Sequence, residues 1–355
     1  MDLETAIKHY LEDKYGKDIT LKEITKLGSG LVADGYKVVF INKGVETKIV
    51  CRQLRGIGLS RDYLADNVGY LLLQHQISQI HPTHINSIDV VCYGEEVRTV
   101  SIDGIENVFQ VMEFAEGKSY IEFISKISKE ETLSKQQKEI IENISSYMAR
   151  IHEIKPMQLS DEIFKHYYWR HSQDYIGSEV FMDIMDVWDN DKLLDAQGKT
   201  EMMTNLFRIR ESLRSEYKRC SMIHSDLHPD NIRVQEDLTI RPLDSARAMW
   251  GEPADDLTSM LANFIYFGLK NDGSLKGSYL EAYNLMLNKY IELTQDKDIS
   301  KHAQLYLPVR LLILAHPDFF SSDTLELKNM LINFAKKILN DSHFDLLVVP
   351  KLLSI

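Results

Sequence analysis

The chain has 355 residues, of which 44% are hydrophobic, and its 53 acidic against 41 basic residues give a net charge of −12. This size allows one large or two medium domains with cores of their own, while the acidic balance excludes the basic surface of a nucleic-acid-binding protein. Because no stretch approaches the roughly 18 apolar residues of a membrane span and the N-terminus has no apolar signal core, we expect a cytoplasmic protein with reduced cysteines and no membrane partner.

The first third of the sequence consists of short apolar stretches separated by glycines, a pattern typical of strands. We expect strands at residues 24–27, 35–41, 47–54, 88–93 and 107–114, with a helix at about 61–79. Beyond residue 117 the spacing becomes helical, and we expect long helices at 135–152, 255–269, 278–294 and 302–315. The sequence therefore predicts an α+β fold with a small, mainly antiparallel β lobe over residues 1–114 and a larger, mainly helical lobe over 115–355.

A glycine-rich turn lies between the first two predicted strands and contains Gly28, Ser29 and Gly30. Glycine lets backbone amides approach phosphate groups closely, so these three residues are candidates for binding the phosphates of a nucleotide. A glycine-rich hairpin turn without a ligand is an equally ordinary use of the same residues. The third predicted strand carries two cations, Lys48 and Arg52, each of which can hold a phosphate or face solvent.

The most specific pattern is the run from His224 to Asn231, which reads His-Ser-Asp-Leu-His-Pro-Asp-Asn. Asp226 and Asn231 lie five residues apart on one tight loop, so one can face a substrate hydroxyl while the other faces a metal. Asp244 follows thirteen residues after Asn231, a distance that a short two-stranded hairpin covers, which would return a second acidic ligand to the loop. A base and two oxygen ligands for Mg²⁺ suit phosphoryl transfer, because that reaction depends mostly on positioning and charge neutralisation.

The same run admits a second interpretation, a transition-metal hydrolase. His224, Asp226, His228 and Asp230 alternate, and imidazole and carboxylate groups are ordinary ligands of zinc and iron. However, the alternation and Pro229 would direct these side chains to opposite sides of the loop. A purely structural polar loop is a third interpretation, but it does not explain the apolar strands on both sides or the return of an acidic residue.

With these residues the sequence resembles the aminoglycoside phosphotransferase and choline kinase family of protein-kinase-like small-molecule kinases, whose catalytic loop reads His-Gly-Asp-Leu-His-Pro-Gly-Asn. The resemblance implies a kinase-like bilobal fold and transfer of the γ-phosphoryl group of ATP, with Mg²⁺, to a hydroxyl of a small molecule. It implies that Asp226 is the catalytic base, that Asn231 and Asp244 hold Mg²⁺, and that His224 braces the loop.

The chain departs from the family pattern at three places: Ser225 and Asp230 stand where glycines are common, and Ser245 stands where an aromatic residue is usual. These departures concern the geometry of the loop rather than its ligands. The absence of Asp-Phe-Gly and Ala-Pro-Glu segments argues against a protein kinase, which needs them to dock a peptide.

The resemblance extends over about residues 24–264 and implies roles for residues in the first lobe. Arg52 matches the cation that holds the α- and β-phosphates, with Lys48 in reserve, and Asp66 on the following helix is the carboxylate expected to pair with Arg52. The short side chain of Asp66 leaves open a pseudo-kinase that binds nucleotide or a partner without turnover. Over residues 109–117 the resemblance implies a hinge, in which Met112 lines the adenine pocket and the backbones of Glu113 and Ala115 bind the purine.

Two further positions have structural roles by resemblance or by their place in the sequence. The segment from Trp250 to Leu257 matches a family segment whose last aspartate is a buried brace of the catalytic loop, which makes Asp256 such a brace without chemistry. Asp255 is expected to cap the helix that follows. His152, at the end of a predicted helix, is expected to be structural because a helix C-terminus favours it.

Residues 156–217 have no match in the family pattern, so we expect them to select the acceptor. They combine aromatic residues with acids, which suits an amine or a polyhydroxylated cation, and the acidic net charge also favours a cationic substrate. The alternative is a helix whose apolar stripe is buried and whose acids are solvated. The aromatic and basic residues run from Tyr167 to His171, the acids are Asp174, Glu179, Asp183, Asp186, Asp189 and Asp191, and the stripe is Phe181, Ile184, Met185 and Trp188.

Overall fold

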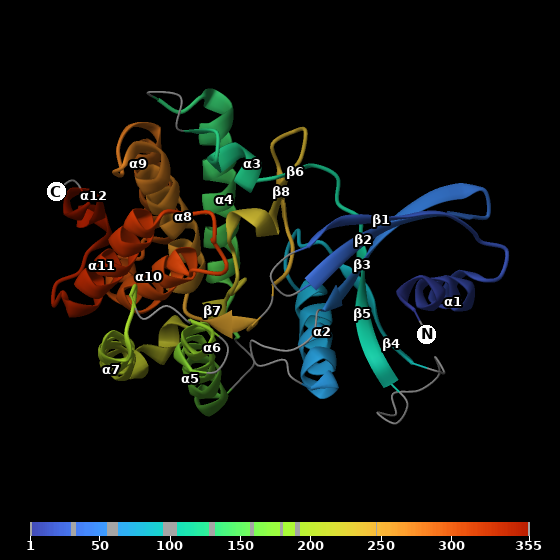
Figure 1. Cartoon of the computed structure of the whole chain (residues 1–355), viewed down its shortest axis with the longest axis horizontal. Coiled ribbons are helices and arrows are strands. Elements are labelled where there is room, and N and C mark those ends of the chain that lie inside the picture. The colour runs from blue at the N-terminus through green and yellow to red at the C-terminus, as the bar shows by residue number, and fades with distance from the viewer. Residues whose placement is uncertain are drawn as a thin grey trace. The chain divides into compact units, whose positions relative to one another are not determined.

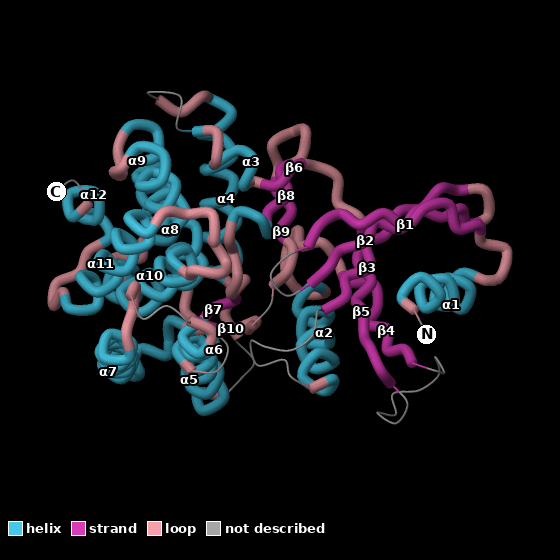
Figure 2. The backbone as a smooth tube through the Cα atoms, viewed as in Figure 1, coloured by secondary structure: helices cyan, strands magenta, loops and turns pink. Residues whose placement is uncertain are grey.

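The structure is a computed structural model that describes residues 2–29, 33–54, 63–94, 105–127, 132–156, 160–177, 180–188, 192–245 and 247–353. The contacts divide the chain into two compact units, Met1–Glu116 and Gly117–Ile355. Figure 1 shows the elements of both units and Figure 2 shows their distribution of helix and strand, with strands concentrated in the first unit. Each unit is described by itself.

The first unit is built on a five-stranded antiparallel sheet in the order β1-β2-β3-β5-β4. Its strands are β1 (Thr20–Ser29), β2 (Ala33–Asn42), β3 (Val45–Leu54), β4 (Ser87–Gly94) and β5 (Ile105–Glu113). The turn between β2 and β3 is tight because Lys43 and Gly44 both have positive φ angles, 49° and 82°, the conformation that matches the twist of a two-residue hairpin. The five predicted strands are thus confirmed, although β1 begins four residues earlier than predicted.

Two helices lie on opposite faces of this sheet (Figure 1). Helix α1 (Leu3–Tyr15) packs Ala6, Ile7, Tyr10 and Leu11 against one face, where Ile49 and Cys51 of β3 belong to the same apolar core. Side chains alternate along a strand, so the side chain of Arg52 points to the other face, on which helix α2 (Leu64–Ser78) lies. The sheet therefore separates an apolar core under α1 from a more polar face under α2.

The second unit is mainly helical. Its helices are α3 (Ile121–Ile124), α4 (Lys135–Glu153), α5 (Asp161–Ile176), α6 (Phe181–Asp186), α7 (Ala196–Leu213), α8 (Ala254–Asp272), α9 (Gly277–Thr294), α10 (Ile299–Ala315), α11 (Leu325–Asn340) and α12 (Val349–Leu352). Short 3₁₀ segments occur at Arg214–Arg219, Pro229–Asn231 and Leu346–Val348. The four long helices predicted from the sequence are confirmed as α4, α8, α9 and α10.

Helix α8 is the centre of this unit. Nearly all of its side chains are buried, from Ala254 through Tyr266, as expected for a helix surrounded by others. It packs against α9 and α10, while α10 also packs against α11 and α4 packs against α9. In the described residues, no helix is long and apolar enough to cross a membrane.

Five short strands surround the predicted catalytic loop, four of them between α7 and α8 and the fifth, β6, before α3. They form a two-stranded sheet of β7 (Ser221–Met222) and β10 (Trp250–Gly251) and a three-stranded sheet of β6 (Lys118–Ser119), β8 (Ile232–Val234) and β9 (Ile240–Pro242). In the hairpin of β8 and β9, Ile232 lies opposite Pro242. The hairpin predicted between Asn231 and Asp244 is therefore confirmed.

Candidate active site

The loop between β7 and β8 is anchored by the first turn of α8. The backbone amides of His224 and Ser225 each donate to one oxygen of the Asp256 carboxylate, at 2.8 Å in both cases. The ring of His152, at the end of α4, lies 3.1 Å from the same carboxylate and 2.8 Å from the hydroxyl of Tyr290. Because Asp256 is fully buried and holds two backbone donors, its contacts are those of a brace.

Two serines at the positions that depart from the family pattern join the catalytic loop to the segment after β9. Ser225 has a φ of +62°, a left-handed conformation that is unfavourable for residues other than glycine. Its hydroxyl accepts hydrogen bonds from the amides of Arg247 and Ala248, each at 3.0 Å. The hydroxyl of Ser245 donates to the carbonyl of His224 at 2.9 Å. The serines thus supply bonds across the loop that glycine and an aromatic residue would not make.

Asp226 lies between two guanidinium groups. Its Oδ1 atom accepts hydrogen bonds from Arg247 Nη1 at 2.9 Å and Arg310 Nη1 at 3.0 Å, while its Oδ2 atom lies 3.9 Å from Nε2 of His228. Burial raises the pKa of the Asp226 carboxyl, but the charges of Arg247, His228 and Arg310 outweigh burial and hold the pKa well below its usual range. Asp226 is therefore a carboxylate at neutral pH.

Asn231 and Asp244 meet at the open end of the β8–β9 hairpin. The backbone amide of Leu243 donates to the carbonyl of Asn231 at 3.0 Å, and Asp244 is the next residue. The side-chain amide of Asn231 donates to the carbonyl of Asp226 at 3.0 Å, which fixes the orientation of the amide and directs Oδ1 away from this bond. An amide oxygen and a carboxylate are hard oxygen donors of the kind Mg²⁺ prefers, so the chemistry of these residues fits that ion.

Asp255 has a different role from the one predicted. Pro253 occupies the N-cap position of α8, and Asp255 lies inside the first turn, fully buried. Its carboxylate accepts a hydrogen bond from Arg310 Nη2 at 2.8 Å and lies 3.1 Å from Nε2 of His171 on α5. The predicted helix cap is therefore wrong, because the carboxylate turns into the core to pair with a buried arginine rather than toward its own backbone.

A second buried ion network lies in the same unit. Arg219 donates to Glu252 at 2.8 to 3.2 Å and to Asp296 at 2.6 to 2.9 Å, and Tyr168 and His302 also contact Glu252, at 3.0 and 3.2 Å. Burial raises the pKa of the Glu252 carboxyl, but His302 and Arg219 outweigh burial and hold it well below its usual range. Among the described contacts, none joins Arg219 to Asp226.

In the first unit, Arg52 and Asp66 have different partners from those predicted. Arg52 Nη1 donates to the side-chain oxygen of Gln74 at 2.7 Å, eight residues or about two turns further along α2 than Asp66. Asp66 instead accepts from the backbone amide of Tyr63 at 2.9 Å and closes the start of α2. Because an acid at the third position of a helix bonds readily to the N-terminal backbone, this local bond competes with a pair to Arg52.

The other nucleotide-side predictions fall on β1, β3 and β5. Lys48 is exposed and lies 3.4 Å from the carboxylate of Glu116. Met112 is buried in β5, and the amide of Glu113 donates to the carbonyl of Asn86 at 2.9 Å, within the sheet. Ala115 follows the end of β5. Gly28 and Ser29 pair with Gly35 and Asp34 across the β1–β2 hairpin, and Gly30 lies outside the described residues.

Part of the segment expected to select the acceptor lies in the core. Phe181, Ile184, Met185 and Trp188 are all buried, which confirms the buried-stripe alternative for α6. Asp186 is exposed, and Asp174 forms an ion pair with Arg170 at 3.3 Å one turn away. Glu179, Asp189 and Asp191 lie outside the described residues.

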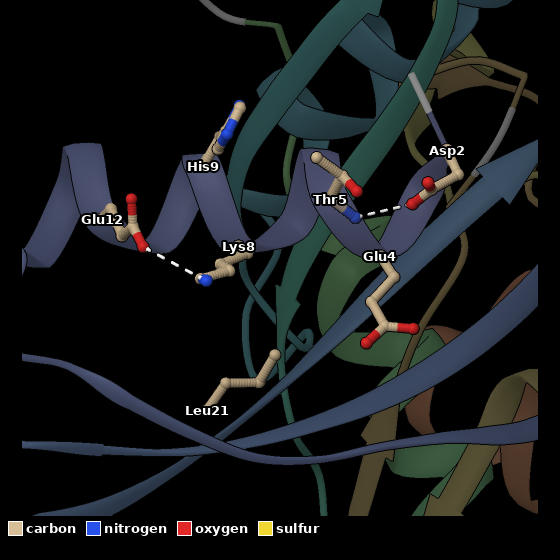
Figure 3. Close-up of a pocket in the computed structure, with 7 residues that line it drawn as sticks. All are labelled: Asp2, Glu4, Thr5, Lys8, His9, Glu12 and Leu21. Carbon is tan, nitrogen blue, oxygen red and sulfur yellow. Dashed lines mark hydrogen bonds and ion pairs between the residues drawn. The ribbon is translucent and has the colours of Figure 1, made fainter.

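One hollow of about 380 Å³ lies on the surface of the first unit, and none of the predicted site residues lines it. Figure 3 shows its lining side chains along the exposed side of α1, with Leu21 of β1 beneath them. Among the lining residues, the Asp2 carboxylate accepts a hydrogen bond from the backbone amide of Thr5 at 2.8 Å, and Lys8 forms an ion pair with Glu12 at 4.0 Å. Both are ordinary features of a surface helix. The hollow is therefore a surface feature of α1 rather than a candidate catalytic site.

Comparison with known proteins agrees with the geometry of the loop. The model of the phosphotransferase enzyme family, APH, matches residues 87–293, more than half of the chain. The chain belongs to this family. Its membership, together with its kinase neighbours, confirms the predicted enzyme class, a small-molecule kinase.

Solved structures of phosphotransferases share the fold. Choline kinase LicA from Streptococcus pneumoniae has a TM-score of 0.52 at 12% identity, covering 95% of this chain and 98% of that one. For Plasmodium vivax ethanolamine kinase the TM-score is 0.51 at 18% identity, and the match covers 95% of this chain and 87% of that one. For aminoglycoside phosphotransferase APH(4)-Ia it is 0.51 at 12% identity, covering 96% and 99%. None of the curated proteins matches the sequence. The predicted kinase-like α+β fold is confirmed.

Three polar residues of this phosphotransferase contact the loop or its supports but were not predicted: Arg247, Arg310 and His171. Arg247 follows Asp244 by three residues and lies within residues 24–264, over which the family resemblance extends. Arg310 is the single charged residue between His302 and Ala315, and an arginine in so apolar a helix must be paired if it is buried. The isolated charge in an apolar stretch therefore indicates that Arg310 is paired, but it does not indicate with which residues.

The described residues include no group of three or more histidine, cysteine, aspartate and glutamate side chains placed to hold a metal ion. A zinc or iron hydrolase builds its centre from such a group, usually with three protein ligands. Mg²⁺ in kinases differs, because it is bound by one or two protein oxygens together with substrate phosphates and water. The hydrolase interpretation therefore gains support neither from the ligands nor from the family.

Proposed function

We propose that the protein transfers the γ-phosphoryl group of ATP to a hydroxyl of a small molecule in a Mg²⁺-dependent reaction. The observation that carries the proposal is the arrangement of Asp226, Asn231 and Asp244, which the β8–β9 hairpin gathers at one loop. Such a loop presents a base and two oxygen ligands side by side, the components that phosphoryl transfer needs. The family and its kinase neighbours support the reaction class.

In this proposal Asp226 orients the acceptor hydroxyl and receives its proton. A carboxylate with a strongly lowered pKa is a weak base, so it acts mainly by holding the hydroxyl in line and takes the proton late in the transfer. That is sufficient for a loose transition state, in which little proton abstraction precedes bond breaking. Asn231 and Asp244 would hold Mg²⁺, which when bound neutralises the charge of the phosphates.

On the nucleotide side, we assign phosphate contacts to the backbone of Gly28, Ser29 and Gly30 and to the guanidinium of Arg52. The bond from Arg52 Nη1 to Gln74 orients the guanidinium, whose planar fork suits a phosphate. Adenine contacts are assigned to Met112 and to the backbones of Glu113 and Ala115. Asp66, His224 and Asp256 are assigned supporting roles only.

The acceptor is a small hydroxyl compound, and the similar structures suggest which to try first. A thermostable mutant of APH(4)-Ia was solved with AMP-PNP and hygromycin B, and other similar structures are kinases of choline and ethanolamine. Aminoglycosides, amino alcohols and sugars are therefore the classes to test.

The experiment is ADP release from MgATP with a panel of hygromycin B, choline, ethanolamine and neutral sugars, alongside an EDTA control. We expect one class to raise ADP release in a Mg²⁺-dependent way, and Asp226→Asn to remove that rise. MgATP binding without turnover for any acceptor would instead indicate a pseudo-kinase. Stoichiometric zinc or iron with no response to MgATP would contradict the proposal.

A further inference from the structure

Arg310 is a buried charge in an apolar helix. It lies on α10, where its side chain is 6% exposed and its neighbours Val309 and Leu311 are fully buried. Burying an unpaired guanidinium is very costly, so an arginine at this place must be paired. In the described residues both Nη atoms of Arg310 have acceptors, whereas Nε has none. Its position is thus determined by its partners, which identify what it does.

The partners of Arg310 are two carboxylates on different elements and, at 3.4 Å from Nη2, the backbone carbonyl of Ser225. Nη1 donates to Oδ1 of Asp226 at 3.0 Å, and Nη2 donates to Oδ1 of Asp255 at 2.8 Å. The guanidinium also lies 5.6 Å from the ring centre of Tyr175. One rigid, planar group therefore joins the catalytic loop to the first turn of α8, a geometry that the single ammonium of a lysine does not reproduce.

The Asp226 carboxylate is consequently held at one oxygen. Oδ1 accepts from both Arg247 and Arg310, whereas no described donor comes within hydrogen-bonding distance of Oδ2, since His228 is 3.9 Å away. Two donors on one oxygen restrict rotation of the carboxylate about its last bond. The other oxygen remains available for a substrate.

We propose that Arg310 is a positioning residue: it holds Oδ1 of Asp226 so that Oδ2 is presented to the acceptor hydroxyl. The inference rests on the proposed kinase function, in which Asp226 acts on that hydroxyl. Misplacing a catalytic group by about 1 Å can cost roughly 100-fold in rate, so a residue that fixes the carboxylate can matter without contacting the substrate.

The other end of Arg310 is itself well supported. Asp255 also contacts His171 of α5, whose second ring nitrogen accepts from the amide of Glu252 at 3.2 Å. Gly251 lies against this ring, and a Cβ atom there would come within 2.5 Å of it. The chain of contacts from α5 through Asp255 to Arg310 thus keeps the guanidinium from following the movements of the loop.

A purely structural role for Arg310, as the counter-charge of Asp255, is the alternative that the test must separate. Arg219 provides a matched control, because it is also a largely buried arginine that joins two carboxylates in the same unit, Glu252 and Asp296. Loss of either arginine should lower stability. Only loss of Arg310 should alter the presentation of Asp226.

The experiment compares Arg310→Met, Arg310→Lys and Arg219→Met for ADP release from MgATP with the best acceptor of the panel, and for thermal unfolding. We expect Arg310→Met to lower kcat about 10- to 100-fold while the KM for MgATP stays within about threefold. Arg310→Lys keeps the charge but loses the two-pronged guanidinium, so its kcat should fall between those of Arg310→Met and the parent. Arg219→Met should unfold at a lower temperature, with kcat within about threefold of the parent.

A second comparison uses Arg310→Ala and Arg219→Ala with added guanidinium chloride at millimolar concentration. Guanidinium should restore part of the lost kcat in Arg310→Ala and have no such effect in Arg219→Ala. The inference is overturned if Arg310→Met or Arg310→Lys turns over like the parent, or if both arginine positions lower kcat by the same factor. If Arg310→Met does not fold, Arg310→Lys decides. A parent that neither binds MgATP nor releases ADP would instead refute the kinase proposal itself.

Discussion

The two units hold their candidate site residues in different ways. In the second unit, two carboxylates behind the catalytic loop are fully buried and each has two or more partners: Asp256 accepts from the loop amides, and Glu252 pairs with Arg219 and His302. In the first unit, Lys48 forms an exposed pair with Glu116, and Arg52 is oriented by a neutral glutamine. Buried, fully bonded networks give a geometry that needs no ligand, whereas exposed pairs contribute little to geometry or stability.

This comparison shows which unit positions each group of proposed site residues. The proposed base and Mg²⁺ ligands are set by the folding of the second unit alone. The proposed phosphate contacts of the first unit rely on backbone amides and on the guanidinium of Arg52. Substitutions in the second unit should therefore affect kcat and stability, and those in the first unit should affect nucleotide affinity.

The largest expected effect is that of Asp226→Asn. The amide keeps the shape of the side chain but cannot receive the proton, so kcat should fall by about 10²–10⁴ while MgATP binding is retained. Steady-state ADP release and an MgATP titration followed by thermal unfolding measure the two quantities. A kcat within about threefold of the parent would remove Asp226 from the role of base.

The next effect contrasts a buried with an exposed carboxylate. Glu252→Gln removes the fully buried one of the two carboxylates that pair with Arg219 and should lower the free energy of unfolding by roughly 3 kcal/mol or more. Glu116→Gln removes the charge of an exposed carboxylate that pairs with Lys48 and should change the free energy of unfolding by less than about 0.5 kcal/mol. Urea unfolding of both variants measures the contrast, and equal losses would contradict the comparison between the units.

The same carboxylate predicts how stability depends on pH. The pKa of Glu252 is lower in the folded protein than the value of about 4.5 expected in the unfolded chain. Its contribution is therefore present at neutral pH and is lost as the pH falls below about 4.5, because the unfolded chain then binds a proton more readily. Urea unfolding between pH 7 and about pH 4 should show a steeper loss for the parent than for Glu252→Gln. Parallel curves would contradict this assignment.

A smaller effect separates the two cations of β3. Arg52→Met should raise the KM for MgATP about tenfold or more, the cost of one charge-assisted contact, with little change in kcat. Lys48→Met, on the same face of the strand, should change the KM by less than about threefold because its ammonium is exposed. The opposite order would identify Lys48 as the phosphate-binding cation.

The smallest effect concerns the strained serine of the loop. Ser225→Ala removes the acceptor of two backbone hydrogen bonds and keeps the left-handed conformation, so it should destabilise the fold by about 1–2 kcal/mol. Ser225→Gly loses the same bonds but relieves about 1 kcal/mol of backbone strain, so it should be the milder change. Urea unfolding ranks the two, and a larger loss for glycine would show that strain at Ser225 is negligible.

The sequence predicted features that depend on neighbours along the chain. Strand alternation, helical spacing and the thirteen residues from Asn231 to Asp244 all reflect local geometry, and the strands, long helices and hairpin were confirmed. The resemblance also marked Asp256, because the segment around it has a recognisable order.

Contacts that depend on packing were not predictable in this way. Arg310 is 84 residues from Asp226, and the pair exists only because α10 packs beside α8. Asp255 was expected to bond to its own backbone, but the buried arginine attracts its carboxylate more strongly. Asp66 was expected to pair with Arg52, but it bonds locally at the start of α2.

The most direct test of the kinase site is thermal unfolding of the parent and of Asp244→Ala with MgATP and with ATP plus EDTA. Ligands that bind only the folded state raise the unfolding temperature according to their concentration relative to Kd. The account predicts that the parent is stabilised by MgATP and much less by ATP with EDTA, and that Asp244→Ala loses the Mg²⁺-dependent part. An equal rise for both proteins, with and without Mg²⁺, would contradict the assignment of Asp244 and Asn231 as Mg²⁺ ligands.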